Sequence, residues 1–329
     1  MTFATGIGSM PGDDARDYAE AVRLSLGELP DLPFVPELPG RGPGADMTGR
    51  ALAVVDGLCV DLQPAGWRLT DASGMDHRRA RSLLAQDLDQ VEEQSQGYTG
   101  AFKTQVTGPW TLAATVEKPR GDRVLSDHGA RRDLAQALAE GLLGHVADLK
   151  RRLPGVERLI VQVDEPALTA VLAGSVPTAS GFGRHRTVHP PEASAALEIV
   201  LGAITSAGAE PWVHSCASGV PWDLITGAGA RGLSVDHDVL VSADMDALAQ
   251  VLDDGGVVAL GVVPTTDAGG VPSDSTLTER VLRWLDMLGL DPAEVRERLV
   301  ITPSCGLAGA SGDWRRGALA LSHAVARNL

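Results

Sequence analysis

Two side chains that commonly ligate zinc stand at the end of one short apolar stretch. Residues 211–216 have the composition of a strand, and this stretch ends in a His-x-Cys pattern formed by His214 and Cys216. Alternate side chains of a strand point to the same side, so the imidazole and the thiol can face one point. A neutral imidazole and a thiolate are ligands that zinc prefers. The pattern is short, however, and by itself a weak signal.

A second cysteine strengthens the zinc interpretation. The chain contains three cysteines, and Cys305 follows an apolar run, residues 299–301, much as Cys216 follows its own. With His214 and one carboxylate, these two cysteines would supply the four ligands of a tetrahedral zinc site. The third cysteine, Cys59, lies within an apolar run, and we expect it to be a thiol of the hydrophobic core.

The charge of such a site indicates its chemistry. Two thiolates and a carboxylate outweigh the charge of Zn²⁺ and leave the centre anionic. A zinc of this kind is a poor acid towards water, whereas hydrolytic zinc sites keep mostly neutral ligands. It suits a substrate thiol, which loses its proton on coordination. We therefore predict alkyl transfer to sulfur rather than hydrolysis.

The overall composition excludes several classes of protein. The chain of 329 residues has a net charge of −15, and its only lysines are Lys103, Lys118 and Lys150. Nucleic-acid partners need clustered Lys and Arg, so we expect none. No apolar run approaches the roughly 18 residues of a membrane span, and we see no secretory signal. Three cysteines do not make a disulfide framework, and we expect a reducing, cytoplasmic location.

The elements that would position these residues alternate between strands and helices. Eight stretches have the pattern of strands: residues 2–7, 32–37, 101–107, 156–163, 211–216, 232–236, 257–263 and 299–302. Helical patterns cover residues 15–26, 47–55, 78–93, 131–152, 191–207, 245–252, 277–288 and 314–325. Eight βα units in a chain of this length predict a closed (β/α)8 TIM barrel, with residues 1–329 as a single domain. Prolines make 32–37 awkward as a central strand, and residues 58–62 would form a strand outside the main sheet.

In such a barrel the carboxyl ends of all strands open onto one face. The polar residues near those ends are Ser9, Glu37, Gln105, Thr107, Asp164, Glu165, His214, Cys216, Asp236, Asp267 and Cys305. Most of them can ligate a metal or hold a polar ligand, so we expect the zinc site at this face. Two simpler interpretations stay open. Asp164 and Glu165 would also suit the cap of the helix that follows them, and Trp110 would also suit packing.

Taken together, these residues resemble the catalytic domain of cobalamin-independent methionine synthase, from Ile7 to about Trp314. The His-x-Cys pattern at His214 matches two zinc ligands of that family. The Ser-Cys-Gly-Leu segment around Cys305 is similar to the family's Asp-Cys-Gly-Leu, which holds the last zinc ligand. The Asp-Glu-Pro-Ala-Leu segment that begins at Asp164 matches the family segment whose Asp contacts the homocysteine amine.

Further segments carry the same resemblance. Ile7, Gly8 and Ser9 are similar to the first-strand segment that holds the homocysteine carboxylate in the family. Glu37 falls where a homocysteine-contacting glutamate is expected. The Gly-Pro-Trp-Thr segment with Trp110 resembles the Gly-Pro-x-Thr that opens the loop near the methyl donor. The resemblance therefore implies substrate binding by these residues.

Three departures from the family pattern concern the site. The family's remaining zinc ligand is a Glu at the end of strand six; Asp236 stands there, with a side chain roughly 1.5 Å shorter. We expect Asp236 to be the fourth ligand, with His237 or Asp238 as alternatives. The family's catalytic His after strand seven is missing, and Asp267 is the candidate to handle protons instead. The family's long form has an additional N-terminal barrel, which this chain lacks.

The resemblance implies a zinc-dependent methyltransferase that converts homocysteine into methionine. The methyl donor would be 5-methyltetrahydrofolate or a methylated corrinoid protein, and the scarce lysines weigh against a polyglutamylated folate. One alternative is a related zinc alkyltransferase that acts on another thiol, such as coenzyme M. Ser9 and Asp164 together favour an amino-acid thiol over a sulfonate. Another alternative is a zinc-holding barrel that has lost catalysis and serves as a binding partner.

Overall fold

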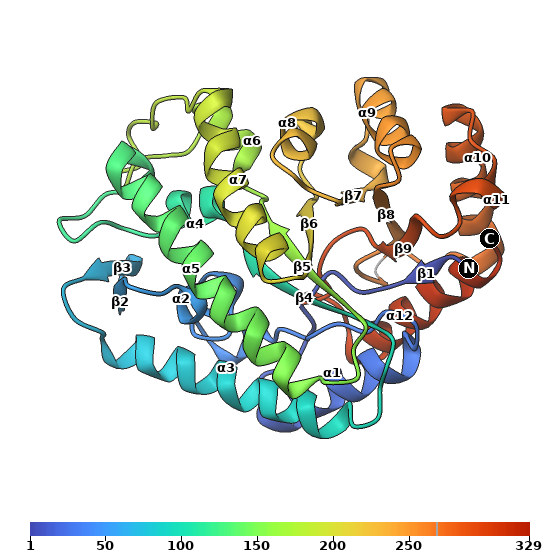
Figure 1. Ribbon diagram of the computed structural model, residues 1–329, viewed down its shortest axis with the longest axis horizontal. Coiled ribbons are helices and arrows are strands. Elements are labelled where there is room, and N and C mark those ends of the chain that lie inside the picture. Colours follow the sequence, from blue (N-terminus) through green and yellow to red (C-terminus); the bar gives the residue numbers. More distant parts are fainter. Residues whose placement is uncertain (268) are drawn as a thin grey trace.

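The centre of the molecule is a curled sheet of seven parallel strands in the order β1-β9-β8-β7-β6-β5-β4, with helices on the outside (Figure 1). The computed structural model describes residues 1–267 and 269–329. The strands are β1 (Phe3–Ala4), β4 (Ala101–Thr107), β5 (Arg158–Asp164), β6 (Glu210–Ser215), β7 (Gly232–Asp236), β8 (Val257–Val263) and β9 (Leu299–Pro303). Six of the predicted strands are therefore confirmed to within two residues.

Residues 33–37 span the opening between β1 and β4 without forming a regular strand. The backbone N–H of Val35 donates to Lys103 O (2.9 Å), and Lys103 N–H donates to Pro33 O (2.9 Å). On the other side, Glu37 N–H donates to Gly8 O (3.0 Å). The prediction of a strand over 32–37 is wrong in this respect, because prolines in this segment have no N–H to donate. With this bridge, the curled sheet is consistent with a TIM-like barrel.

The long helices cover the outside of the sheet. They are α1 (Ala15–Glu28), α2 (Met47–Val54), α3 (Met75–Gln94), α5 (His128–Arg152), α7 (Pro190–Ser206), α9 (Ser242–Asp253), α10 (Asp274–Leu288) and α12 (Gly312–Arg327). All eight predicted helices are confirmed, with ends that differ by at most three residues. Side chains of Asp14, Asp46, Asp127 and Ser311 accept hydrogen bonds from N–H groups of the first turn. These donors would otherwise be unpaired, which explains where these helices begin.

Several shorter elements lie in the connections. They are α4 (Pro109–Thr115), α6 (Leu168–Leu172), α8 (Trp222–Gly227) and α11 (Pro292–Val295), and the 3₁₀ helices η1 (Pro39–Arg41), η2 (Val124–Ser126) and η3 (His237–Val239). The strands β2 (Cys59–Gln63) and β3 (Gly66–Thr70) form a separate antiparallel hairpin, as predicted for residues 58–62. Cys59 is only partly buried there, so its assignment to the core is wrong. In the described part of the chain, no helix is long and apolar enough to span a membrane.

The interior of the curled sheet has an apolar layer below a polar layer. Ile160 of β5 and Trp212 of β6 pack in a small cluster with Leu32, Val257, Ala259 and Val300. Because side chains alternate along a strand, Gln162 and Asp164 point to the same side as Ile160, and His214 to the same side as Trp212. The apolar residues near the strand starts thus fill the bottom of the sheet. The polar residues near the strand ends remain available for a site.

Candidate metal and substrate site

Three of the predicted metal ligands lie together at the carboxyl ends of β6 and β9. The ligand atoms of His214, Cys216 and Cys305 all lie within 4.8 Å of one another. The two sulfur atoms are 2.7 Å apart, and Cys305 Sγ is 3.9 Å from His214 Nε2. Both cysteines are free thiols. The structure therefore brings together residues almost ninety positions apart in the sequence.

The backbone of β7 orients the imidazole of His214. Its Nδ1 lies 3.1 Å from Ser234 O and 3.0 Å from Ser234 Oγ. A proton on Nδ1 donated to the carbonyl leaves the lone pair of Nε2 directed at the cysteines, as in many metal-ligating histidines. Burial opposes the charged imidazole, but Cys305 and Asp164 outweigh it and raise the pKa of His214. The ring is thus fixed by a neighbour outside the ligand group.

This donor set fits zinc. Tetrahedral zinc, with Zn–S bonds of about 2.3 Å, would hold the two sulfurs roughly 3.8 Å apart, so they would separate by about 1 Å on binding. The hydrogen bond between the thiols lowers the pKa of Cys216 and, together with burial, raises the pKa of Cys305. One thiol therefore already stabilises the thiolate of the other. A pair of cysteines beside an oriented imidazole is the ligand chemistry of a zinc site.

Asp236, the predicted fourth ligand, ends the adjacent strand but lies outside the ligand group. Its Oδ1 accepts a hydrogen bond from the backbone N–H of Asp238 (2.9 Å) and caps η3. Among the described residues, the group of possible metal ligands contains His214, Cys216 and Cys305 but not Asp236. The alternatives His237 and Asp238 contact each other, with Nδ1 and Oδ1 3.3 Å apart. The identity of the fourth ligand stays a prediction.

A cavity of about 300 Å³ lies beside the ligand group and brings most of the predicted substrate residues together. It is lined by Ile7, Gly8, Ser9, Glu37, Asp164, His214, Cys216 and Cys305, together with Pro39, Asp46, Met47, Pro166 and Gly306. Trp110, Asp236 and Asp267 do not line it. A larger cavity of about 510 Å³ lies over α8, but it is lined by none of the predicted site residues. A cavity with convergent polar groups is the better candidate for a binding site.

Two glycines allow the residues around Ser9 to lie close to their neighbours. A Cβ atom on Gly8 would lie 2.7 Å from the Gln105 side chain, and one on Gly306 would lie 2.0 Å from Ser9 Oγ. The backbone N–H of Leu307 donates to Ser9 O (2.7 Å), which joins the segment after β9 to the segment after β1. The serine therefore faces the cavity directly beside Cys305.

Glu37 and Asp164 are buried carboxyl groups in the cavity wall. Burial raises the pKa of Glu37, an effect that Arg50 partly offsets from 3.4 Å away. Burial likewise raises the pKa of Asp164, against the influence of His214 and Lys103. Carboxylates held among cationic neighbours can accept charge-assisted hydrogen bonds from an ammonium group. The pair suits the amino group of an amino acid.

Below these carboxyl groups lies a lysine that the sequence patterns do not reveal. Lys103, on β4, is completely buried, and its Nζ donates to Ile7 O (2.8 Å) and Gln162 Oε1 (3.0 Å). The amide of Gln162 in turn donates to Ile7 O (3.0 Å) and Asp164 Oδ1 (2.7 Å). Burial lowers the pKa of Lys103 to about 8, although Asp164 favours its charged form. Lys103 and Gln162 therefore hold the Ile7 carbonyl and Asp164 in place.

Glu165 and Trp110 have structural roles. Glu165 Oε1 accepts a hydrogen bond from Trp110 N–H (2.9 Å), and Oε2 accepts from Thr111 N–H (2.8 Å) and Oγ1 (2.7 Å). Glu165 thus caps a helix, but it caps α4, which follows β4, rather than the helix after its own strand. Burial raises the pKa of Glu165 to about 7. Trp110 is buried and donates Nε1–H to Ala193 O (3.0 Å), which favours packing over ligand contact.

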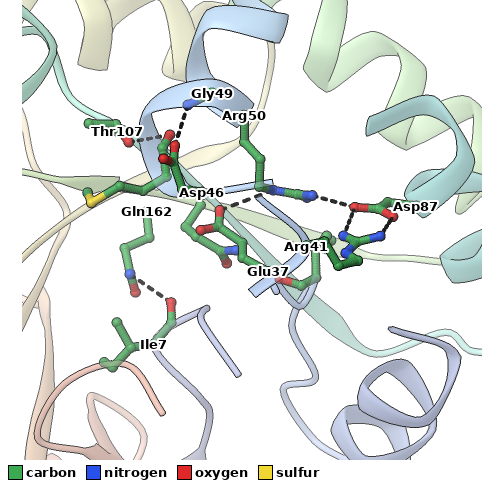
Figure 2. Close-up of polar contacts among 12 residues, drawn as sticks. Ile7, Glu37, Arg41, Asp46, Gly49, Arg50, Asp87, Thr107 and Gln162 are labelled. Atoms are coloured by element: carbon green, nitrogen blue, oxygen red, sulfur yellow. Dashed lines mark hydrogen bonds and ion pairs between the residues drawn. The ribbon is translucent and has the colours of Figure 1, made fainter. Parts of the chain in front are cut away.

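Asp267 was predicted to belong to the site but does not line the cavity, whereas Asp46 was not predicted and does line it. Asp267 is exposed after β8, and its Oδ2 accepts a hydrogen bond from Ser311 Oγ (2.9 Å), so its role in proton handling stays a prediction. Asp46 lines the cavity, although no motif or spacing along the chain predicts this. Its side chain accepts a hydrogen bond from Gly49 N–H (2.7 Å) at the start of α2 (Figure 2). Burial raises the pKa of Asp46.

Comparison with known proteins assigns this arrangement to a family. A sequence model described as "Cobalamin-independent synthase, Catalytic domain" matches residues 81–328. Among solved structures, the fold is similar to that of a B12-independent methionine synthase from Shewanella sp. W3-18-1 in complex with selenomethionine. The TM-score is 0.65 at 16% identity, over 100% of this chain and 98% of that chain. At this identity the similarity concerns the fold alone.

Other similarities are weaker. The octameric ribulose-1,5-bisphosphate carboxylase/oxygenase of Pyrococcus horikoshii OT3 gives a TM-score of 0.42 at 12% identity, over 99% of this chain and 58% of that chain. We base no conclusion on it. No curated protein matches the chain.

Proposed function

Because the chain belongs to the cobalamin-independent methionine synthase family, as its motifs predicted, we propose that it transfers a methyl group to the thiol of homocysteine to form methionine. The observation that carries this proposal is the group of His214, Cys216 and Cys305 in the wall of a cavity. The same cavity contains two buried carboxyl groups that suit an amino acid.

The proposed metal is zinc, with His214, Cys216, Cys305 and Asp236 as ligands. When bound, it would supply the acidity that deprotonates the substrate thiol and keeps its sulfur nucleophilic. The two thiolates alone balance the charge of the ion, and Asp236 would make the centre anionic. Its Oδ1 accepts the hydrogen bond from the backbone of Asp238, so Oδ2 of Asp236 would be the ligand atom.

The cavity residues would hold the amino-acid end of homocysteine. Asp164 and Glu37 would accept hydrogen bonds from its ammonium group, and Ser9 would donate to its carboxylate. Ile7 and Gly8 would form the wall beside it. Fixing both end groups would leave the sulfur little freedom, which lowers the entropic cost of reaching the methyl donor.

The proposed methyl donor is 5-methyltetrahydrofolate or a methylated corrinoid protein. Asp267 lies at the exposed carboxyl end of β8, where it would handle the proton that a folate leaving group requires. The position of Trp110 in the core gives no support to the predicted contact with the donor.

The catalytic unit is proposed to be residues 1–329 as a whole. The main hydrophobic cluster includes residues from Ala4 to Ala326, and β1 pairs with β9. A cytoplasmic location stays a prediction from the composition.

The test is a methyl-donor screen with zinc-loaded protein. Homocysteine is offered together with 5-methyltetrahydrofolate or methylcobalamin, and methionine is measured by mass spectrometry. We expect methionine with at least one donor and none from Cys305→Ser. Cys59→Ser is the matched control, since it removes a thiol outside the site and should keep zinc and activity.

Two outcomes would contradict the proposal. Methylation of another thiol, such as coenzyme M, with homocysteine ignored, would overturn the substrate. Failure with every thiol and both donors, in protein that retains zinc, would indicate a metal-holding protein without catalysis.

A further inference from the structure

One carboxylate of the cavity wall forms a buried ion pair with an arginine that lies behind the wall. Arg50, on α2, has its Nε 3.4 Å from Oε1 of Glu37 (Figure 2). Their side chains are only 8% and 5% exposed. Glu37 lines the cavity, whereas Arg50 does not. The guanidinium therefore acts on the carboxylate without occupying the space of a ligand.

Arg50 is itself held by a second pair of charges. Its Nη1 donates to Asp87 Oδ2, on α3. Arg41 also binds Asp87, with Nη1 2.8 Å from Oδ1 and Nη2 2.7 Å from Oδ2, and its guanidinium lies over the ring of Tyr18 at 4.5 Å. Negative and positive groups thus alternate from the cavity to α3. Arg41 binds Asp87 in a bidentate manner, and the fixed Asp87 holds Nη1 of Arg50, which leaves Arg50 little freedom to turn away from Glu37.

The charge of Glu37 depends on these neighbours. Burial raises its pKa and Asp164 on β5 adds to the rise, whereas Arg50 on α2 and Gln105 and Lys103 on β4 lower it. Arg50 is the largest of the opposing influences. Removing it would leave a buried carboxyl group beside a like charge, and such a group takes up a proton. A neutral Glu37 is a weaker partner for an ammonium group.

We propose that Arg50 is a positioning residue that keeps Glu37 as an oriented anion for the amino group of the substrate, and that Asp87 and Arg41 hold Arg50 in place. The inference rests on the proposed function, since it assumes an amino-acid ligand in this cavity. It adds that Arg50, a residue outside the cavity, makes the site selective for ligands that carry an amino group.

The experiment is calorimetric titration of the zinc-loaded full chain with two probes. L-Methionine carries the amino group, and 4-(methylthio)butanoate is the same chain without it. In Arg50→Met we expect affinity for methionine to fall about tenfold or more, the scale of a lost hydrogen bond to a charged group. Affinity for the probe without the amine should change less than about threefold. Arg50→Lys should restore part of the difference.

A double variant separates positioning from general damage to the fold. In Glu37→Gln the carboxylate is already absent, so adding Arg50→Met should cause little further loss of methionine affinity. Asp87→Asn should reproduce a weaker form of the Arg50→Met effect. Arg158→Met is the control away from the cavity: it breaks a more exposed ion pair with Glu210, near the other end of the sheet, and should leave both affinities unchanged.

The pH dependence gives a further readout. In Arg50→Met, methionine affinity should increase as the pH is raised, because loss of Arg50 leaves burial and Asp164 to raise the pKa of Glu37 further. The wild type should show a smaller increase.

The outcomes distinguish this inference from the proposed function. Equal losses for both probes, or equal losses with and without Glu37→Gln, would overturn the inference and leave methyl transfer intact. Selective loss of methionine binding in a protein that methylates no thiol would overturn the proposed function and support the inference. Failure of the wild type to bind methionine would overturn the inference.

Discussion

Replacing Lys103 by Met gives a test of the cavity floor that the structure makes quantitative. The pKa of Lys103 is about 8 in the folded protein, against an ordinary value of 10.5, because the side chain is completely buried. Below pH 8 the ammonium is charged in both the folded and unfolded states, and the folded state carries the full cost of burying it. Above pH 10.5 the amine is neutral in both states, and that cost is gone.

The stability of the wild type relative to Lys103→Met should therefore rise with pH. Between these two pKa values the unfolded chain binds more protons, and each pH unit contributes up to about 1.4 kcal/mol. From pH 7 to pH 10 the difference in free energy of unfolding should shift in favour of the wild type by roughly 2 to 3 kcal/mol. Urea denaturation of both proteins at several pH values measures this shift, because groups common to both cancel.

Lys118→Met is the matched control, since Lys118 is not fully buried and has no place in the cavity floor. Its difference from the wild type should change less than that of Lys103→Met over the same pH range. If the difference in free energy of unfolding between the wild type and Lys103→Met does not change with pH, Lys103 is not a buried ammonium group with a lowered pKa.

Three further predictions concern single contacts. Gly306→Ala should weaken methionine binding measured by calorimetry, because its Cβ would lie 2.0 Å from Ser9 Oγ; unchanged affinity would show that Ser9 can move at no cost. Asp236→Ala should lower zinc affinity in a chelator competition, and an unchanged affinity would identify a site with three protein ligands. Glu165 has its pKa raised to about 7 from 4.5, so its contribution to stability should fall as pH rises through that window. Between pH 4.5 and pH 7, the free energy of unfolding of the wild type should fall relative to that of Glu165→Gln, as measured by denaturation at both pH values. A difference that does not change with pH would contradict a buried Glu165 with a raised pKa.

Much of the fold follows from local pattern. Strand β8 was predicted to the residue because all its side chains are apolar and buried, as expected for a strand covered on both faces. The same apolar pattern gave a wrong prediction for residues 32–37. Prolines there interrupt the hydrogen bonds of a segment that is otherwise paired with its neighbours. Helices α3, α5, α9 and α10 begin three residues before their predicted starts. Their apolar periodicity begins one turn inside the helix, after the residues of the first turn.

The site could be predicted where residue type suggests chemistry, or where a segment resembles the family pattern, as Ile7, Gly8 and Ser9 do. Cys216 and Cys305 are residues of the first kind, and parallel strands that open onto one face bring them together. The roles of Lys103 and Arg50 depend on partners from other elements, which spacing along the chain cannot show. Glu165 illustrates the same limit: its position after a strand suggests a cap, but only the fold identifies α4 as the helix it caps.

X-ray absorption at the zinc edge, with and without homocysteine, tests the central claim most directly. The purified protein should bind one zinc with two sulfur ligands, from Cys216 and Cys305, and homocysteine should add a third sulfur to the same ion. A metal bound without these two sulfurs, or a sulfur count that homocysteine leaves unchanged, would contradict the account.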